Sequence, residues 1–346
     1  MTDKPFSEFL FLETIRRSAR SYSPNLVAGM GDDCAVIACD GWSDLLVTTD
    51  LLIEDVHFDL RWFSLEEVGS KALRVGLSDI AAMGGVPEFA FVSLAVPPSL
   101  VGEGVENLYG GIRETADAYG VTIGGGDLSR SSAGIFVDIM LLGKSDKHQA
   151  VLRSGAAPGD RIFVSGTLGD GALALKLLQA GEEDPEKARL LPRHVRPEPR
   201  LALGRLLATG GQRASAMIDV SDGLSSDLHH ICGASGVGAR IYEDRLPRSE
   251  VYRQVCSRKG EDESALLLHG GEDYELLFTC PPAGGEKILS LPLPCPVTEI
   301  GEILAPDEGL SIVWADGNGE ILEPRGYNHF RRPEGPKGRG AGQSLP

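Results

Sequence analysis

Side chains that can bind a cation follow short apolar runs at several places in this chain. In the clearest case the apolar run LLV at residues 45–47 is followed at once by Thr48, Thr49 and Asp50. A buried strand that ends in hydroxyl and carboxylate oxygens is a rigid way to hold a hard cation. The alternative is a strand end capped by a turn, in which these side chains bind only local backbone. Recurrence of the pattern along the chain favours the first interpretation.

Two acids, Asp32 and Asp33, stand between glycines and a strand predicted at residues 35–38. Adjacent side chains on an extended chain point to opposite faces, so only one of them can face a shared site. We expect Asp33 to be the inward one. Another acid, Asp79, lies within the apolar last turns of a helix predicted at residues 64–84. It lies either on the solvent face of an amphipathic helix or in a buried position, where it needs a partner or a metal ion.

Acids also follow two further strands. The strand predicted at residues 121–123 ends in GGGD, so Asp127 follows backbone that can approach a ligand closely, although a plain glycine-rich turn has the same composition. The strand SAMIDV runs into a turn in which Asp219 and Asp222 flank Ser221. The helix predicted after that turn leaves backbone amides free for an anion.

Together these acids form a set of oxygen ligands without accompanying His pairs or Cys clusters: Asp33, Asp50, Asp79, Asp127, Asp219 and Asp222. Ligation by oxygen alone favours Mg²⁺ over zinc or copper. Carboxylates that converge without a cation repel one another, whereas several Mg²⁺ ions convert them into a phosphate-binding surface. Arg153 is a solitary base between acid-rich segments, and it pairs either with a nucleotide phosphate or with an exposed acid.

Charge and composition exclude several classes of protein. A net charge of −17 disfavours nucleic acid as a partner, because the field repels polyanions. The P-loop motif and the protein-kinase motif set are absent from the sequence. The six cysteines form no C-x-x-C pair and are typical of free thiols in a reducing cytoplasm. Because we find neither a signal peptide nor an apolar run of about 20 residues, we expect a cytoplasmic protein without a membrane partner.

Length and a polar boundary predict two domains. The 346 residues exceed what one core usually serves, and residues 145–149 are polar and lack periodicity. We expect an α/β (α+β) chain whose N-terminal domain, residues 1–147, combines a mixed sheet with helices, the first of them at residues 6–20. A C-terminal α/β sandwich domain at residues 148–332 and a disordered tail at residues 333–346 complete the expected organisation.

Seven segments carry a resemblance to a known family: GDDCAVI, TTDLLIEDVHF, KALRVGLSDIAAMGG, GGGDLSR, LRSGAAPGDRIFVSGTLGD, IDVSDGLSSDL and GGEDYELLFT. In this order they resemble the thiamine-monophosphate kinase family, within the superfamily of ATP-binding aminoimidazole-ribonucleotide-synthetase-like proteins. The resemblance implies phosphorylation of thiamine monophosphate by ATP, with several Mg²⁺ ions. It also implies a homodimer made by strands of the N-terminal domains, with ATP in the groove between the domains.

The motif matches imply three sets of site residues. The metal ligands would be Asp33, Thr48, Thr49, Asp50, Asp79, Asp127, Asp219 and Asp222. The residues in contact with ATP would be Tyr109, Gly126, Asp127, Arg153 and Ser221. The residues in contact with the thiamine phosphate would be His57, Glu272 and Tyr327. The aromatic face of Tyr327 suits a cationic thiazolium, and plain core packing is the alternative for this residue.

The acceptor of this reaction would supply its own nucleophile. A phosphate monoester has a second pKa of about 6, so it is largely dianionic at neutral pH. We therefore expect no catalytic side-chain base, and we expect His57 to bind and orient the substrate. Two alternatives stay open: an aminoimidazole-ribonucleotide-synthetase-like enzyme, which the VHF and GGEDYEL segments disfavour, and a non-catalytic nucleotide-binding protein, which would have lost some metal ligands.

Overall fold

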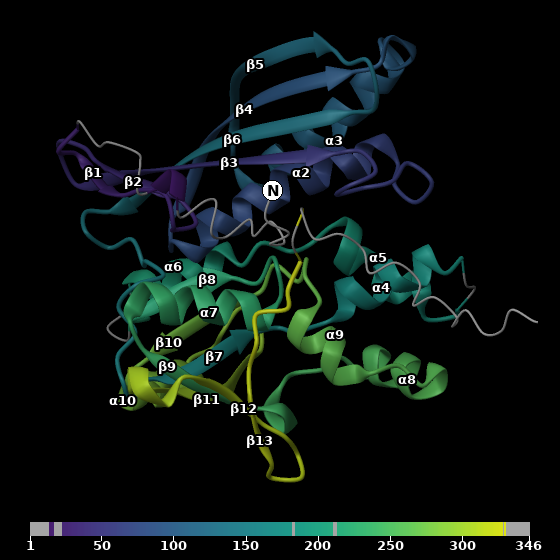
Figure 1. Cartoon of the computed structure of the whole chain (residues 1–346). Helices are drawn as coiled ribbons and strands as arrows, with labels where there is room; N and C mark the ends of the chain where they lie inside the picture. Colours follow the sequence, from purple (N-terminus) through teal and green to yellow (C-terminus); the bar gives the residue numbers. More distant parts are fainter. Residues whose placement is uncertain (1–13, 17–22, 182–183, 210–212, 328, 330–346) are drawn as a thin grey trace, which may run out of the picture.

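The computed structural model describes residues 14–16, 23–181, 184–209, 213–327 and 329. Most of the helix expected at residues 6–20 lies outside this part of the chain, although residues 14–16 are helical, and the tail expected to be disordered lies outside it entirely. Two α/β domains lie one above the other in Figure 1, the first sheet at the top and the second domain in the lower half. The predicted two-domain α/β fold is therefore confirmed.

The first domain is built on a mixed six-stranded sheet in the order β1-β2-β3-β6-β4-β5. Its strands are β1 (Leu26–Ala28), β2 (Ala35–Ala38), β3 (Ser43–Ile53), β4 (Val86–Val96), β5 (Thr122–Arg130) and β6 (Phe136–Asp146). All neighbours are antiparallel except β4 and β5. That parallel pair is joined through helix α3 (Glu103–Tyr119), because parallel strands need a crossover connection.

Helix α2 (Leu65–Ala82) is the element against which both domains pack. It begins at a capping box, since Ser64 Oγ accepts a hydrogen bond from Glu67 N and the Glu67 carboxylate accepts one from Ser64 N. It contacts α3 and the first sheet on one side, and on the other it contacts α6 (Leu201–Thr209) and β8 (Ala216–Asp219) of the second domain. The helix predicted at residues 64–84 is therefore confirmed.

Two strands are longer than predicted and carry polar residues within them rather than beyond their ends. β3 includes Thr48, Thr49 and Asp50, because it pairs with β6 along its whole length. β5 continues through the glycines and includes Asp127, because its parallel pairing with β4 runs on to Arg130. The GGGD segment is therefore part of an edge strand and not a turn.

The second domain contains a mixed seven-stranded sheet in the order β13-β12-β9-β11-β7-β10-β8, in which only β9 and β12 are parallel neighbours. Its other strands are β7 (Arg161–Ser165), β9 (Gly238–Tyr242), β10 (Leu276–Cys280), β11 (Val297–Leu304), β12 (Leu310–Val313) and β13 (Gly319–Ile321). Its other helices are α4 (Asp170–Gln179), α5 (Lys187–Val195), α7 (Leu224–Ser235), α8 (Glu250–Lys259), α9 (Glu263–His269) and α10 (Pro282–Ser290). β10 starts later than the strand predicted at residues 274–279, because Tyr274 has a left-handed φ of 49°.

Small residues let the two domains approach closely at the end of α2. Ala81 and Ala82 of α2 belong to one buried apolar cluster with Leu203 and Leu207 of α6. A Cβ added at Gly204 would lie 2.0 Å from the carbonyl oxygen of Ala81, so any larger residue there would force the helices apart. The interface between the domains is thus part of the protein's core.

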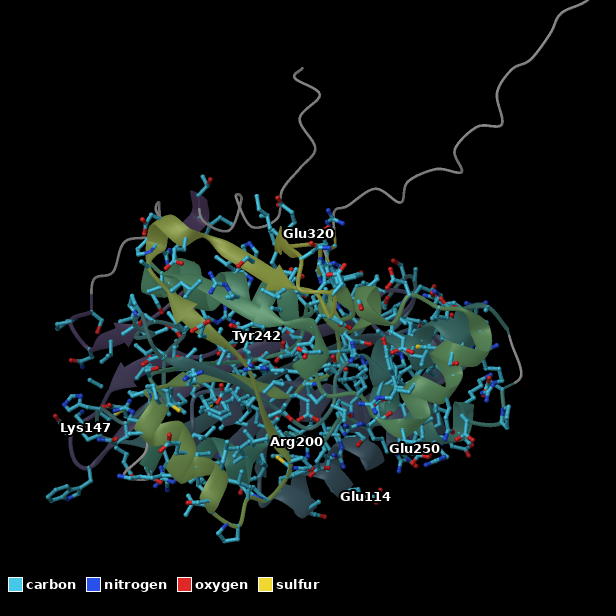
Figure 2. All side chains as sticks on the ribbon, turned by 90° about the horizontal axis from the view of Figure 1, so that it is seen from below. Glu114, Lys147, Arg200, Tyr242, Glu250 and Glu320 are labelled. Atoms are coloured by element: carbon cyan, nitrogen blue, oxygen red, sulfur yellow. The ribbon has the colours of Figure 1, made fainter. Side chains whose placement is uncertain are left out.

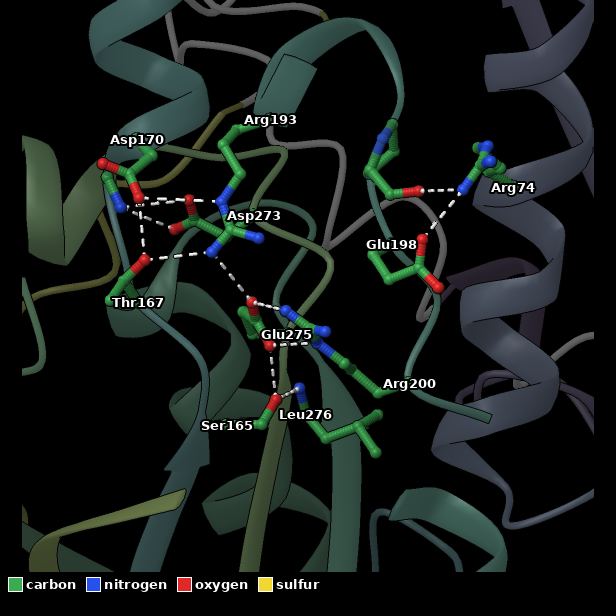
Figure 3. A network of polar contacts seen from close by, with 12 residues as sticks. Arg74, Ser165, Thr167, Asp170, Arg193, Glu198, Arg200, Asp273, Glu275 and Leu276 are labelled. Atoms are coloured by element: carbon green, nitrogen blue, oxygen red, sulfur yellow. Dashed lines mark hydrogen bonds and ion pairs between the residues drawn. The ribbon is translucent and has the colours of Figure 1, made fainter. Parts of the chain in front are cut away.

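A polar network extends this interface (Figure 3). Arg74 of α2 donates hydrogen bonds of 3.1 Å to the Pro197 carbonyl oxygen and 3.2 Å to Glu198. Arg200 follows two residues later and donates a hydrogen bond of 2.7 Å to Glu275. The segment between α5 and α6 is therefore fixed to both domains.

The chain leaves the first sheet after β6, close to the polar segment noted in the sequence. Lys147, at the edge of the molecule in Figure 2, lies 2.8 Å from the buried Asp44. His148 then adopts a left-handed φ of 60°, and the next strand, β7, belongs to the second sheet.

No helix in the described ranges is long and apolar enough to cross a membrane.

Candidate functional site

Three carboxylates from separate elements converge where α2 meets the second domain. Asp33 precedes β2, Asp79 lies near the end of α2 and Asp219 ends β8, and one oxygen of each lies within 4.8 Å of the other two. We call these three residues the acid cluster. Asp33 is buried and is the inward member of its pair, and Asp79 lines a cavity instead of lying on the solvent face of its helix.

Hydroxyl groups fix two members of the acid cluster. Ser78 Oγ donates a hydrogen bond of 2.6 Å to Asp219 Oδ2, and Thr48 Oγ1 donates one to Asp79 Oδ2. The first bond crosses the domain interface, and the second joins β3 to α2. The acid cluster is therefore held by both domains.

Arg153 fixes the third member. Its Nη2 donates a hydrogen bond of 2.6 Å to Asp33 Oδ1, and its backbone N–H donates one of 2.6 Å to Asp32 Oδ1. Arg153 thus pairs with a buried acid. The sequence offers a nucleotide phosphate or an exposed acid as its partner, so the observed partner differs from the second alternative in being buried. Arg153 lies beside the acid cluster and balances part of its charge.

Asp50 adjoins the acid cluster and adds to its negative charge. Burial, together with nearby carboxylates that include Asp33, raises the pKa of Asp50 to about 6 and that of Asp219 to about 7. Burial and the same neighbours also raise the pKa of Asp79. Without a cation, these acids therefore hold their protons up to unusually high pH.

The donor set fits a hard divalent cation. Asp33 Oδ2 and Asp50 Oδ2 are buried oxygens without a hydrogen-bond partner. Asp33, Asp50, Asp79, Asp219 and Thr48 offer carboxylate and hydroxyl oxygens, the ligands that Mg²⁺ prefers. A bound cation would lower the pKa of these acids and supply the missing partner for their oxygens. The residues present are therefore suited to hold Mg²⁺.

Thr49 and Asp127 do not join the acid cluster within one chain. Side chains alternate along β3, so Thr49 points to the opposite face from Thr48 and donates a hydrogen bond of 2.8 Å to Asp138 Oδ1. Asp127 lies opposite Ser93 of β4, which in turn lies opposite Asp138. Thr49 and Asp127 therefore share the face of the first sheet that is turned away from α2.

The nucleotide residues expected from the sequence are divided between two places. Tyr109, Gly126 and Asp127 line a hollow of about 300 Å³ beside β5. Gly126 is required there, because an added Cβ would lie 1.8 Å from a backbone oxygen of β4. Arg153 and Ser221 lie near the acid cluster instead. The five residues expected to contact ATP therefore do not meet at one place within a single chain.

A cavity of about 1030 Å³ opens between the domains beside the acid cluster. Its size is at the upper end of the range of small-molecule sites. It is lined by Asp50, Asp79, Asp219, Ser221 and Asp222 together with all three residues expected to bind the acceptor, His57, Glu272 and Tyr327. Phe58, Trp62, Phe63 and Leu266 add apolar surface. The cavity thus combines cation ligands with room for an organic acceptor.

His57 is held as a neutral hydrogen-bond donor. Its Nδ1 accepts a hydrogen bond of 3.0 Å from Ile53 N, so the neutral ring carries its proton on Nε2. Burial, and next the nearby His329, lowers the pKa of His57. His329 lies 5.0 Å from His57 and 4.9 Å from Tyr327 between ring centroids. Tyr327 is 53% exposed and is therefore not a core residue.

A second group of side chains that could hold a metal ion is not predicted as a group by the sequence. Asp222, Asp227 and His230 place ligand atoms within 4.8 Å of one another at the start of α7. Asp227 Oδ2 also accepts a hydrogen bond of 3.1 Å from Gly223 N. Asp227 and His230 are three residues apart, a spacing that places them on one helical face and could have indicated the group.

Two domain-family models match consecutive parts of the chain. The N-terminal domain of AIR synthase related proteins matches residues 31–145, and the C-terminal domain of the same proteins matches residues 157–313. These matches cover most of both domains, although β1, β13 and the cavity residue Tyr327 lie outside them. Fold and site together define an AIR synthase related protein.

Full-length relatives narrow this class. The chain is 38% identical over 310 residues to the thiamine-monophosphate kinase of Bacillus subtilis. The aligned region covers 88% of this chain and 93% of the relative. It is 36% identical over 330 residues to that of Aquifex aeolicus, at 94% and 99% coverage. A solved structure, AaThiL complexed with AMPPCP and TMP, matches with a TM-score of 0.81 at 35% identity, over 93% of this chain and 96% of that one. The chain belongs to the thiamine-monophosphate kinase family.

Proposed function

We propose that this chain transfers a phosphoryl group from ATP to thiamine monophosphate, giving ADP and thiamine diphosphate. Family membership and one structural observation support this activity. The cavity beside the acid cluster is lined by His57, Glu272 and Tyr327, the residues expected to contact the acceptor. The two alternatives, a synthetase-like enzyme and a non-catalytic nucleotide-binding protein, lack comparable support, because the relatives at 36–38% identity are thiamine-monophosphate kinases.

Several Mg²⁺ ions are held, in this proposal, by Asp33, Thr48, Thr49, Asp50, Asp79, Asp127, Asp219 and Asp222. Such ions would supply positive charge that neutralises the negative charge developing in phosphoryl transfer. The nucleotide is bound by Tyr109, Gly126, Asp127, Arg153 and Ser221. Arg153 supplies a cation beside the cluster, and the unpaired oxygens of Asp33 and Asp50 support the metal assignment.

The acceptor is bound and oriented without a side-chain base. Its phosphate is largely dianionic at neutral pH, so no proton has to be removed from the attacking oxygen. His57 is suited to donate a hydrogen bond from Nε2, because its Nδ1 is already occupied by Ile53 N. Tyr327 offers an exposed aromatic face to the cationic thiazolium. These residues place the attacking oxygen for in-line transfer.

The protein forms a homodimer through the strands of its first domain, in this proposal. Leu51, Phe89 and Met140 are exposed apolar side chains of that sheet. They share the face turned away from α2 with Thr49 and Asp127, and exposed apolar patches of this kind mark interfaces. A partner copy on this face would complete the nucleotide site, which is divided within one chain.

A cytoplasmic location belongs to the same proposal. All six cysteines are free thiols, and four of them are buried. Free thiols persist in a reducing compartment, whereas secreted proteins commonly form disulfides. Location of a fluorescent fusion in the cell, together with thiol titration of the purified protein, tests this assignment.

The activity is tested by following both products. Purified protein is incubated with Mg²⁺ and ATP, with and without thiamine monophosphate, and ADP and thiamine diphosphate are measured separately. Equal amounts of the two products, formed only with the acceptor present, support the proposal. ATP turnover without thiamine diphosphate would return the acceptor to other members of the superfamily. Light scattering coupled to size exclusion tests the dimer in the same preparation.

A further inference from the structure

A buried cation, Lys71, lines the cavity and has no role in the site proposed so far. It lies on α2, is 1% exposed, and stands seven residues before Ser78, which places both on the same helical face. Lys71 Nζ donates hydrogen bonds of 2.7 Å to Glu272 Oε1 and 3.4 Å to the His57 carbonyl oxygen. One ammonium group thus contacts two of the three residues proposed to bind the acceptor.

Glu272 belongs to the other domain, and its backbone is tightly constrained. It has a left-handed φ of 66°, which few non-glycine residues adopt. Its N–H donates a hydrogen bond of 2.7 Å to the Ser221 carbonyl oxygen. A Cβ added at the preceding Gly271 would lie 2.5 Å from the same oxygen. The constrained backbone therefore fixes the position of the Glu272 Cα. The contacts of the carboxylate with its neighbours fix the far end of the side chain.

The second carboxylate oxygen of Glu272 also has a close neighbour. His194 Nδ1 lies 2.8 Å from Glu272 Oε2, and His194 is buried against Phe63, with ring centroids 5.4 Å apart. The ring of the same Phe63 lies 5.3 Å from Lys71 Nζ. Burial acts to raise the pKa of Glu272, but Lys71 and His194 outweigh it and hold the pKa at about 2. Glu272 is therefore a fixed carboxylate throughout the neutral range.

We infer that Lys71 is a positioning residue for the acceptor, which holds Glu272 and the His57 loop in register across the domain interface. The inference rests on the proposed function and deepens it. A neutral side chain of similar length would fill the same space without the cost of burying a charge. The ammonium group is needed for orientation, because it is the group that joins an acceptor residue of the first domain to one of the second.

The test separates acceptor binding from nucleotide binding. Lys71→Met removes the ammonium group and keeps the length and apolar packing of the side chain. We expect the KM for thiamine monophosphate to rise at least tenfold, while the KM for ATP stays within twofold and kcat within threefold. Arg74→Met is the matched control, because Arg74 lies one turn further along α2 and also binds the second domain, but does not line the cavity. It should leave both KM values within twofold.

A double-mutant cycle distinguishes positioning from a general effect on the fold. If Lys71 acts through Glu272, the Lys71→Met/Glu272→Gln variant will have an acceptor KM close to the higher of the two single values. Independent effects would instead multiply. Multiplied effects would overturn the inference.

The controls also separate failure of this inference from failure of the proposed function. If the wild-type protein makes no thiamine diphosphate, both fail together. If the wild type is active and Lys71→Met raises the acceptor KM no more than Arg74→Met does, only the role of Lys71 is refuted. Should Lys71→Met lose its thermal unfolding transition, His194→Gln tests the other partner of Glu272. It should raise the acceptor KM at least threefold, and an unchanged value would refute the inference.

Discussion

Ser78 of α2 and Asp219 of β8 are joined across the domain interface by a hydrogen bond of 2.6 Å. Both residues are buried, at 0% and 3% exposure. The bond fixes one carboxylate of the acid cluster and at the same time links the two domains. The candidate metal site is therefore built into the interface between the two domains.

Ser78→Ala tests the structural value of this bond. The substitution leaves a buried carboxylate oxygen of Asp219 without its donor, which should lower the free energy of unfolding by about 1–3 kcal/mol. Urea denaturation followed by circular dichroism measures the change. The control is Ser290→Ala, since Ser290 is exposed and its Oγ donates only to the Lys287 carbonyl oxygen. Its effect should stay within about 0.5 kcal/mol. Equal losses in the two variants would contradict the prediction.

Asp79→Asn should lower the turnover rate and raise the thermal stability of the metal-free protein. Asparagine keeps an oxygen that can accept the hydrogen bond from Thr48 but removes a charge from the acid cluster. Turnover should fall by at least about 100-fold, because stabilisation by metal ions accounts for several kcal/mol of such barriers. In chelator at pH 8 the melting temperature should rise, since repulsion among buried carboxylates is relieved. Asp146→Asn, at an exposed pair with Arg205, is the control and should change neither quantity appreciably.

In the presence of a chelator, the free energy of unfolding should decrease as the pH rises. Carboxylates with lowered pKa values, the more common case, give the opposite dependence. The pKa values of about 6 for Asp50 and about 7 for Asp219 lie above the value of about 3.9 expected in the unfolded chain. The folded protein without metal therefore binds more protons, and the stability that these protons provide is lost as the pH rises from 5 to 8. Differential scanning fluorimetry in EDTA should show the melting temperature falling over this range. Added Mg²⁺ should restore more stability at pH 8 than at pH 5, and an equal gain at both would count against the site.

His57→Gln should weaken acceptor binding without removing a catalytic base. His57 Nδ1 is occupied by Ile53 N, and glutamine retains a donor that can partly replace Nε2–H. We expect the acceptor KM to rise about fivefold to twentyfold, which corresponds to the loss of a hydrogen bond of about 1–2 kcal/mol. The shape of the pH–rate profile should be unchanged. A variant with normal affinity, a steep loss of turnover and a missing limb in that profile would show that His57 transfers a proton.

Glu275→Gln should be far more damaging than the same change at an exposed ion pair. Glu275 is buried and contacts Arg193 and Arg200, and its charge balances both (Figure 3). Removing one partner of a buried ion pair costs about 3–5 kcal/mol, which urea denaturation can resolve. Glu299→Gln is the control, because Glu299 is a half-exposed partner of Arg161. It should cost at most about 1 kcal/mol.

Local sequence signals predict the elements of this fold better than their extents. The helix predicted from residue 64 does begin there, because both hydrogen bonds of the capping box at Ser64 and Glu67 form within four residues. The extent of β3 depends instead on β6, which lies about 90 residues later. Asp50 is therefore within a strand and not at its end. The same dependence on a partner strand explains why Asp127 lies in β5.

The sequence also predicts the acid cluster better than the buried groups that contact Glu272. Asp33, Asp79 and Asp219 stand out because carboxylates beside apolar runs need a reason to be there. Lys71 and His194 carry no such signal. A lysine on a helix is usually solvated, and only the approach of Glu272 from the other domain makes Lys71 a buried residue. Contacts between residues about 200 positions apart cannot be read from local pattern.

The position of α2 has a consequence for how this chain can be divided. Its topology describes two domains, yet Lys71, Arg74 and Ser78 of one helix each take a hydrogen-bond acceptor from the second domain. A fragment that ended after β6 would leave these donors and the apolar surface of Ala81 in water. A fragment that began at β7 would lack the donors that Lys71 provides to Glu272 and Ser78 provides to Asp219. The two halves should therefore melt in a single cooperative transition and should not survive as separately expressed proteins.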